Sequence, residues 1–372
     1  MFKHTYVSKK FTTYLVAFIC ASSLGLGTLS NTQAASITSG QATTVTANAA
    51  TPTASSIPSV EPTVALPPVP NYGGEAVVLI DGDTGEVLTS RNPNKWMNPA
   101  STTKMVTLLT AIDKKGTQFD QLATITPYAV SMEPSIVGLR VGDQITLAGV
   151  AEAMIVASGN DAAVVLAQNV DGSIAAFSKD MNEEAKKAGA VNSVFLNPHG
   201  LTQAGHHTTA MDLAKIAVYA MKNPMFHDLV GDDYYSVPYQ NRPHDTLRTT
   251  NLFIRSGYPG ANGLKTGYTQ AAGDCLIASA TRNGHTFIAV MLNDDDRWVD
   301  APHLLDYAFA RANILDAEKA RQEAQAKALK VQEEALFPHK NTKVNQKKAK
   351  QKKKNHISNE AKTTTINKNQ TA

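Results

Sequence analysis

The chain has 372 residues, of which 42% are hydrophobic and 18% charged, and its formal net charge at pH 7 is +3. This length and composition allow one large or two ordinary domains with a sizeable core, which excludes a wholly disordered protein. The two cysteines, Cys20 and Cys275, exclude a fold held by a disulfide framework, because Cys20 lies in a segment that we expect to be removed.

The N-terminus is typical of an export signal. Lys3, Lys9 and Lys10 precede the mostly apolar stretch FTTYLVAFICASSLGLGT, and the small residues of NTQAAS then suit cleavage by a signal peptidase. We therefore expect residues 1–35 to be a signal peptide and the protein to be exported to the periplasm or cell envelope, peripheral rather than transmembrane. An uncleaved membrane anchor is the alternative, although polar residues interrupt a segment that is short for a span.

The next segment changes from linker composition to strand patterns. Residues 36–70 are dominated by Ser, Thr, Ala, Val and Pro, which is typical of an extended, disordered linker. Ordered structure should begin near Asn71. The first ordered stretch, EAVVLIDGDTGEVLTS, has two β-type runs around DGDTGE and predicts a hairpin.

Helical periodicity dominates the middle of the chain. MVTLLTAIDKK has helical spacing, and LAGVAEAMIVASGNDAAVVLAQNV predicts two helices broken at residues 158–160. SIAAFSKDMNEEAKKAG and TAMDLAKIAVYAMKN predict further helices. Past Lys265, DCLIASATRNGHTFIAVMLND predicts a hairpin about RNG, and DAPHLLDYAFARANIL a helix. Strands at both ends predict an α+β fold: a mainly antiparallel sheet flanked by helices, with an inserted helical lobe.

The C-terminal region differs from the rest in composition. We expect residues 316–336, rich in Ala, Glu, Lys and Gln, to form an exposed helix. Residues 337–372 contain ten lysines and one acidic residue, which predicts a disordered tail attracted to polyanions. In an exported protein these would be anionic lipid headgroups or cell-wall polymers, and we expect no nucleic acid. A solvated tail without a specific partner is the alternative.

One short segment could carry nucleophilic chemistry. NPASTTKM places Ser101 three residues before Lys104, so the two side chains share a face if the segment is helical. Serine is a weak nucleophile that needs a neighbouring base. Lys104 could accept the proton if burial and a second cation kept it neutral. Taken alone, however, the octet favours an ordinary helix cap at Ser101.

Two further motifs reverse that preference, namely SGN at residues 158–160 and KTG at residues 265–267. With the Ser-Lys pair they follow the order and approximate spacing of the three-motif set of penicillin-binding proteins and class A β-lactamases. VLIDGDTGEVL, FLNPHGL, GHHTTAMDLAKIA and ANGLKTGYT extend the likeness over residues 71–315. This region resembles the low-molecular-mass penicillin-binding proteins, which are serine-type D-alanyl-D-alanine carboxypeptidases (peptidase family S11).

The resemblance implies a reaction and the residues that catalyse it. Ser101 would attack the carbonyl of the penultimate D-Ala in a peptidoglycan stem pentapeptide, with Lys104 as general base. Ser158 would relay a proton to the departing D-Ala amine, and Asn160 would orient Lys104 and the substrate amide. The backbone N–H groups of Ser101 and Tyr268 would form the oxyanion hole. The enzyme would release the terminal D-Ala without a cofactor and would be inhibited by β-lactam antibiotics.

The third motif would bind the substrate. By the same resemblance, Lys265 and Thr266 receive the terminal carboxylate, and Gly267 lets the substrate backbone approach. We expect Lys265 to be a fixed cation that also depresses the pKa of Lys104. Arg297, in NDDDRW, would be a second contact to the carboxylate.

Other enzyme classes remain as alternatives. A β-lactamase needs a carboxylate for deacylation, but Glu183 and Glu184, between the second and third motifs, lack the expected Glu-x-x-Leu-Asn pattern. A D,D-endopeptidase that cleaves peptidoglycan crosslinks would share all three motifs.

A metal enzyme and a non-catalytic wall-binding protein are more distant alternatives. His199, His206, His207 and Asp212 raise the possibility of a metallopeptidase. The histidines lie in turn-like contexts without ligand spacing, so we expect them to form loop hydrogen bonds and expect no metal site.

Overall fold

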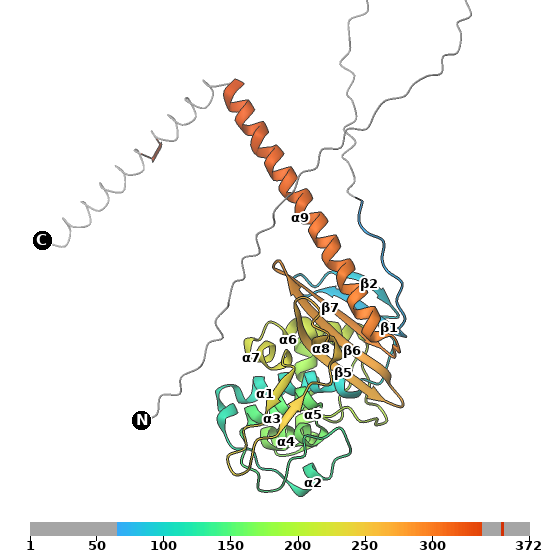
Figure 1. The fold of residues 1–372 in the computed structure, drawn as a ribbon, viewed down its shortest axis with the longest axis vertical. Helices are drawn as coiled ribbons and strands as arrows, with labels where there is room; N and C mark the ends of the chain where they lie inside the picture. The colour runs from blue at the N-terminus through green and yellow to red at the C-terminus, as the bar shows by residue number, and fades with distance from the viewer. Residues whose placement is uncertain (1–64, 337–350, 353–372) are drawn as a thin grey trace, which may run out of the picture. The chain divides into compact units, whose positions relative to one another are not determined.

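The computed structural model describes residues 65–336 and residues 351 and 352 (Figure 1). The predicted signal peptide, most of the predicted linker and nearly all of the Lys-rich tail lie outside the described residues. Within the described part of the chain, no helix has both the length and the apolar composition needed to cross a bilayer.

A five-stranded antiparallel sheet forms the centre of the fold, with strand order β2-β1-β7-β6-β5. The strands are β1 (Ala76–Asp81), β2 (Val87–Arg91), β5 (Ala261–Thr269), β6 (Gly273–Arg282) and β7 (His285–Leu292). Because β1 pairs with both β2 and β7, the N-terminal hairpin joins strands from the far end of the domain. The predicted sheet and the two predicted hairpins are confirmed.

Helices cover both faces of this sheet. Val78 of β1 belongs to a core that includes α6 (Ala210–Ala220), whereas its neighbour Val77 belongs to a second core that includes α9 (Arg297–Leu336). Alternate residues of a strand point to opposite faces, so the sheet separates the two cores. Burial on both faces explains why β6 and β7 are almost continuously apolar.

The helical lobe is built on four longer helices. They are α1 (Thr103–Lys115), α3 (Leu147–Ala157), α4 (Asn160–Asp171) and α5 (Ile174–Lys187). The predicted break between two helices at residues 158–160 is confirmed, with Asn160 as the first residue of α4. We did not predict the short elements, which are α2 (Pro127–Val130), α7 (Pro224–Val230), α8 (Leu252–Arg255), β3 (Tyr234–Ser236), β4 (Thr246–Arg248), and the 3₁₀ turns η1 (Ala100–Thr102) and η2 (Gly116–Asp120).

Helix α9 starts on the sheet and continues beyond it (Figure 1). Its first part packs on the sheet through Leu304, Leu305 and Phe309, whereas residues 319–336 are exposed. The sequence predicted separate segments that meet at residue 315. The backbone does not break there, because the only proline of α9, Pro302, lies near its start and residues 303–336 contain no Gly or Pro, so that only the burial changes.

Candidate active site

Ser101 lies in the 3₁₀ turn η1, directly before α1. The preceding residue, Ala100, has a φ of 48°, a left-handed conformation that is costly for a residue other than glycine. No side chain caps η1 or α1, and the Ser101 Oγ instead lies 2.8 Å from Nζ of Lys104. Ser101 is therefore not a helix cap, and its hydroxyl is paired with the lysine.

Two glycines allow other segments to pack against this turn. A Cβ atom at Gly200, where φ is +89°, would lie only 1.8 Å from the carbonyl oxygen of Ala100. A Cβ at Gly267 would lie 3.1 Å from Cβ of Ala100 and 3.2 Å from the backbone nitrogen of Ser101. Glycine at this position therefore lets the nucleophile turn pack closely on β5. Gly267 also lines the cleft, and its role in the approach of a substrate backbone stays a prediction.

Lys104 is fully buried beneath Ser101 and makes three polar contacts. Its Nζ lies 2.7 Å from Oδ1 of Asn160 and 2.8 Å from the backbone carbonyl oxygen of His199, in addition to the contact with Ser101. The Asn160 amide is oriented by its Nδ2, which donates to the carbonyl of Glu133 at 2.8 Å. Both oxygens can only accept, so a neutral amine donates its two hydrogens to them and directs its lone pair at the Ser101 hydroxyl.

The surroundings of Lys104 favour this neutral form. Burial, and secondarily the charge of Lys265, hold the pKa of Lys104 well below its usual value, whereas the Asp161 carboxylate opposes the shift. The hydrogen-bond geometry and the electrostatics therefore both suit a general base.

Lys265 and Ser158 form a second pair beside the first. Ser158 ends α3 in a left-handed conformation, with φ 58° and ψ 33°. Nζ of Lys265 donates to Ser158 Oγ at 2.9 Å and to the carbonyl of Thr266 at 3.1 Å. Burial lowers the pKa of Lys265 to about 7. Burial thus opposes the charge that we expect Lys265 to carry, and its role as a fixed cation stays a prediction.

A cleft of about 360 Å³ opens above these pairs. Seven of the predicted site residues line it, namely Ser101, Ser158, Asn160, Thr266, Gly267, Tyr268 and Arg297. The two remaining predicted residues, Lys104 and Lys265, are buried, and each forms a hydrogen bond with a residue that lines the cleft. The fold therefore gathers all nine predicted residues at one site.

Arg297 begins α9 and reaches the rim of the cleft. Its Nη1 lies 2.6 Å from Oδ1 of Asp274 and 3.3 Å from the carbonyl of Gly267. The guanidinium is thus held by β5 and β6, and its contact with a substrate carboxylate stays a prediction.

Other residues of the cleft were not identified from the sequence. Pro134 and Ser135 line it from the loop after α2, and Thr250 lines it next to Thr266, with their hydroxyl oxygens 2.8 Å apart. None of these residues lies in a recognisable motif, so nothing in the sequence distinguishes them from other loop residues.

The three histidines form loop hydrogen bonds, as predicted. Nδ1 of His199 accepts from the backbone N–H of Leu201 at 3.1 Å. Nδ1 of His206 accepts from Leu196 N–H at 3.1 Å, and Nδ1 of His207 lies 2.9 Å from the carbonyl of Gly205. Burial lowers the pKa of His199 to about 3 and that of His206 to about 4, so both are neutral.

Comparison with known proteins agrees with this site. Residues 63–296 match the model of the peptidase S11 family, described as D-alanyl-D-alanine carboxypeptidase. The chain is 36% identical to D-alanyl-D-alanine carboxypeptidase DacF of Bacillus subtilis over 248 residues, which are 64% of this chain and 63% of DacF. The chain thus spans less than two thirds of that relative.

Two other similar proteins carry different names. A D-alanyl-D-alanine endopeptidase of Pseudomonas aeruginosa is 30% identical over 280 residues, or 74% of this chain and 87% of that protein. The structure of a mutant Streptomyces K15 DD-transpeptidase has a TM-score of 0.62 and 29% identity, and the match covers 65% of this chain and 99% of that one. The matching family model, together with the three motifs assembled around Ser101, shows that the chain belongs to the D-alanyl-D-alanine carboxypeptidase family, peptidase S11.

Proposed function

We propose that this protein is a serine D-alanyl-D-alanine carboxypeptidase that removes the terminal D-Ala from peptidoglycan stem pentapeptides. The observation that carries the proposal is the buried Lys104, whose contacts with Asn160 and His199 leave its lone pair for the hydroxyl of Ser101. Family membership supports the substrate class.

In the acylation step, the Ser101 Oγ attacks the carbonyl carbon of the penultimate D-Ala while its proton passes to Lys104. The negative charge that develops on the carbonyl oxygen would be stabilised by the backbone N–H groups of Ser101 and Tyr268, two residues that line the cleft. The amide C–N bond then breaks, and the leaving amine needs a proton. Ser158 can supply it, because Lys265 donates to its hydroxyl and can replace the lost proton.

The terminal carboxylate would bind near Lys265, Thr266 and Thr250. A carboxylate next to Lys265 favours its charged form, so a group with a pKa of about 7 becomes protonated on binding. This cation then keeps Lys104 neutral. Substrate binding would thus prepare the base, with Arg297 as a second cation at the rim.

Water completes the cycle by hydrolysing the acyl-enzyme and restoring the Ser101 hydroxyl. Among the described residues that line the cleft, none is Asp or Glu. Glu184, a candidate for a β-lactamase-like role, instead pairs with Lys187 at 2.7 Å on α5. A penicilloyl-enzyme should therefore persist, which favours inhibition by β-lactams over their hydrolysis.

A D,D-endopeptidase is the second candidate, and the relative of that name from Pseudomonas aeruginosa supports it. The bond to be cleaved has the same chemistry in both reactions, because a D-Ala carbonyl is attacked in each. Incubation with crosslinked muropeptide dimers tests the alternative, since only an endopeptidase converts them to monomers.

Labelling with a fluorescent penicillin tests the proposed acyl-enzyme. The protein should bind one label covalently, the Ser101→Ala variant should bind none, and a chelator should have no effect. Labelling that persists in Ser101→Ala, or that a chelator abolishes, would contradict a serine nucleophile at this position. Loss of labelling in Ser101→Ala would also exclude a non-catalytic wall-binding domain.

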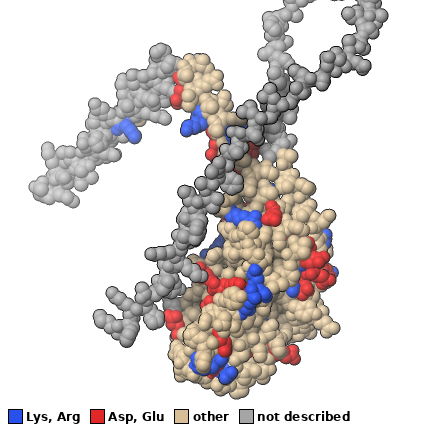
Figure 2. Space-filling model, viewed as in Figure 1, with Lys and Arg blue, Asp and Glu red and all other residues tan. Residues whose placement is uncertain are grey.

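We further propose that the enzyme is exported through residues 1–35, that residues 36–70 are a linker to the catalytic domain at 71–315, and that residues 337–372 attach it to the envelope. The ten lysines of the last segment support attraction to anionic lipids or wall polymers. The face of the folded part in Figure 2 instead shows acidic and basic side chains interspersed. The tail is therefore the stronger candidate for a charge-driven contact than that face.

A further inference from the structure

One wall of the cleft is formed by a loop whose conformation depends on contacts with other segments. Residues 131–146, which we call the cleft loop, connect α2 to α3 and contribute Pro134 and Ser135 to the cleft. Asn160 binds this loop twice, because its Nδ2 donates to the Glu133 carbonyl at 2.8 Å and its backbone N–H to the Ser135 carbonyl at 2.8 Å. The side chain that orients Lys104 thus also touches the wall.

Asp161, the next residue of α4, holds the following part of the cleft loop. Its buried carboxylate accepts backbone N–H groups from Val137 at 2.9 Å, Gly138 at 2.9 Å and Leu139 at 3.2 Å. Three consecutive amides directed at one carboxylate form an anion-binding nest. Gly159 packs against the same nest, since a Cβ there would lie 2.5 Å from Cγ2 of Val137.

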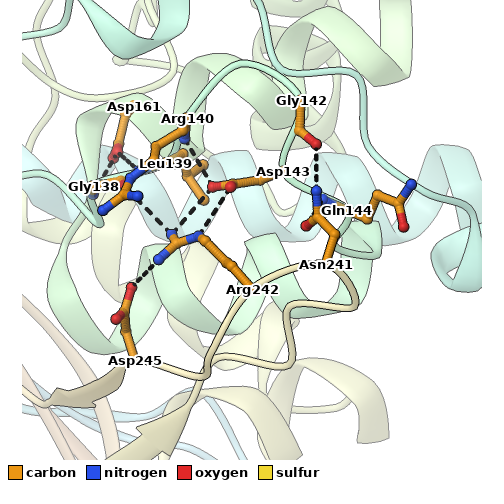
Figure 3. Close-up of polar contacts among 10 residues, drawn as sticks. All are labelled: Gly138, Leu139, Arg140, Gly142, Asp143, Gln144, Asp161, Asn241, Arg242 and Asp245. Carbon is orange, nitrogen blue, oxygen red and sulfur yellow. Dashed lines mark hydrogen bonds and ion pairs between the residues drawn. The ribbon is translucent and has the colours of Figure 1, made fainter.

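Arg242 holds the far part of the same loop, as Figure 3 shows. Its guanidinium makes two bonds to Asp143 of the loop, from Nε at 2.9 Å and from Nη2 at 3.1 Å. Nη1 donates to Asp245 at 2.6 Å, and the guanidinium carbon lies 3.4 Å from the ring centroid of Tyr239. The Asp143 side chain is only 5% exposed, so this bidentate pair is largely screened from water.

The segment that carries Arg242 leads directly to the other side of the cleft. Beyond β4 it reaches Thr250, whose hydroxyl lies 2.8 Å from that of Thr266 and whose backbone N–H donates to the Val156 carbonyl at 3.1 Å. Asn241 adds two bonds to the cleft loop, accepting from Gln144 N–H and donating to the Gly142 carbonyl, each at 2.8 Å (Figure 3). The two walls of the cleft are therefore tied together through this segment.

We propose that Asp161 and Arg242 are positioning residues for the reaction at Ser101, with Asp161 fixing the cleft loop against Asn160 and Arg242 fixing it to the segment that ends at Thr250. The inference rests on the proposed function only for the identity of the substrate. Neither side chain lines the cleft, so both act through the loop. A displacement of about 1 Å in such a wall can cost roughly a hundredfold in rate.

Asp161 has a second effect that Arg242 lacks. The charged or titratable groups that face Lys104 are Lys265 from β5, Asp161 from α4 and the neutral His199 from the loop before Gly200. Of these, the Asp161 carboxylate raises the pKa of Lys104, against burial and the charge of Lys265. The carboxylate that binds the amides of residues 137–139 therefore also makes the protonated Lys104 harder to deprotonate.

The test compares Asp161→Asn, Arg242→Gln and Arg242→Lys with the wild type in the rate of acylation by fluorescent penicillin across pH. Asp228→Asn, an exposed carboxylate on α7, is the matched control. We expect Asp161→Asn to acylate at least about tenfold more slowly at its optimum. The acid limb of its pH–rate profile should move to lower pH, because the anion that favours the charged Lys104 is gone.

Arg242→Gln should raise KM for pentapeptide and slow acylation with the acid limb unmoved, and Arg242→Lys should recover part of the loss. Melting curves identify any variant that has unfolded. If Asp161→Asn is unfolded, the comparison of Arg242→Gln with Arg242→Lys still tests the inference. Acylation within twofold of wild type in folded Asp161→Asn or in Arg242→Gln, or an acid limb that stays fixed in Asp161→Asn, would overturn the inference. Absence of D-Ala release by the wild type would instead count against the proposed function alone.

Discussion

Substituting Gly200 with alanine tests how the nucleophile turn is held. Both Gly200 and Gly205 have left-handed backbones in the same loop, with φ of +89° and +86°. Alanine at either position costs about 1–2 kcal/mol for this conformation. At Gly205 the new Cβ meets only Cδ1 of Leu196, at 3.5 Å, whereas at Gly200 it would lie 1.8 Å from the Ala100 oxygen.

The matched pair separates backbone strain from displacement of Ser101. Relief of the 1.8 Å contact requires a shift of more than about 1 Å in the residue before the nucleophile, enough to slow acylation roughly a hundredfold. Both variants should lose a few degrees in Tm, and Gly200→Ala more. Acylation by fluorescent penicillin should fall sharply in Gly200→Ala and by less than about threefold in Gly205→Ala. In Gly205→Ala the backbone is strained, but Ser101 is not displaced. Equal rates in the two variants would refute the reasoning.

Three further predictions concern charge. Lys265→Gln should raise KM for pentapeptide and move the acid limb of kcat/KM to higher pH, because a cation that lowers the pKa of Lys104 is lost; an unmoved limb would contradict this. Burial and the Asp232 carboxylate raise the pKa of Glu152 from 4.5 to about 8, so the folded protein retains a proton that the unfolded chain releases. Stability should therefore fall as pH rises from about 5 to 8, and Glu152→Gln should flatten that part of a Tm–pH curve, whereas an unchanged slope would exclude the effect. Deletion of residues 337–372, or a high-salt wash, should release the protein from envelope fractions, and an unchanged distribution would dismiss attachment by charge.

The sequence alone predicts those features of the fold and the site that depend on a local pattern of residues. The two hairpins of the sheet and the longer helices carry clear periodicity, and the three motifs identify residues that meet at one cleft although Ser101 and Lys265 lie far apart in the chain. The sequence also predicted one sheet assembled from strands at both ends of the domain, and β1 does pair with β7; the order of the strands comes from the structure.

The features that the sequence did not reveal depend on contacts between distant segments. Asp161 directly follows a motif residue, yet its importance becomes visible only when the amides of residues 137–139 fold around it. Gly200 must be glycine because of Ala100, about a hundred residues earlier. Likewise, the change of composition at residue 315 marks where α9 leaves the sheet. In the sequence, this loss of burial looks the same as the end of one helix and the start of another.

The central claim is that Ser101, activated by Lys104, releases the terminal D-Ala of a stem pentapeptide. The most direct measurement is D-Ala released from purified pentapeptide muropeptide by the wild type and by Ser101→Ala. The account predicts stoichiometric conversion to tetrapeptide by the wild type and none by the variant. Failure of the wild type to release D-Ala, or equal release by Ser101→Ala, would contradict it.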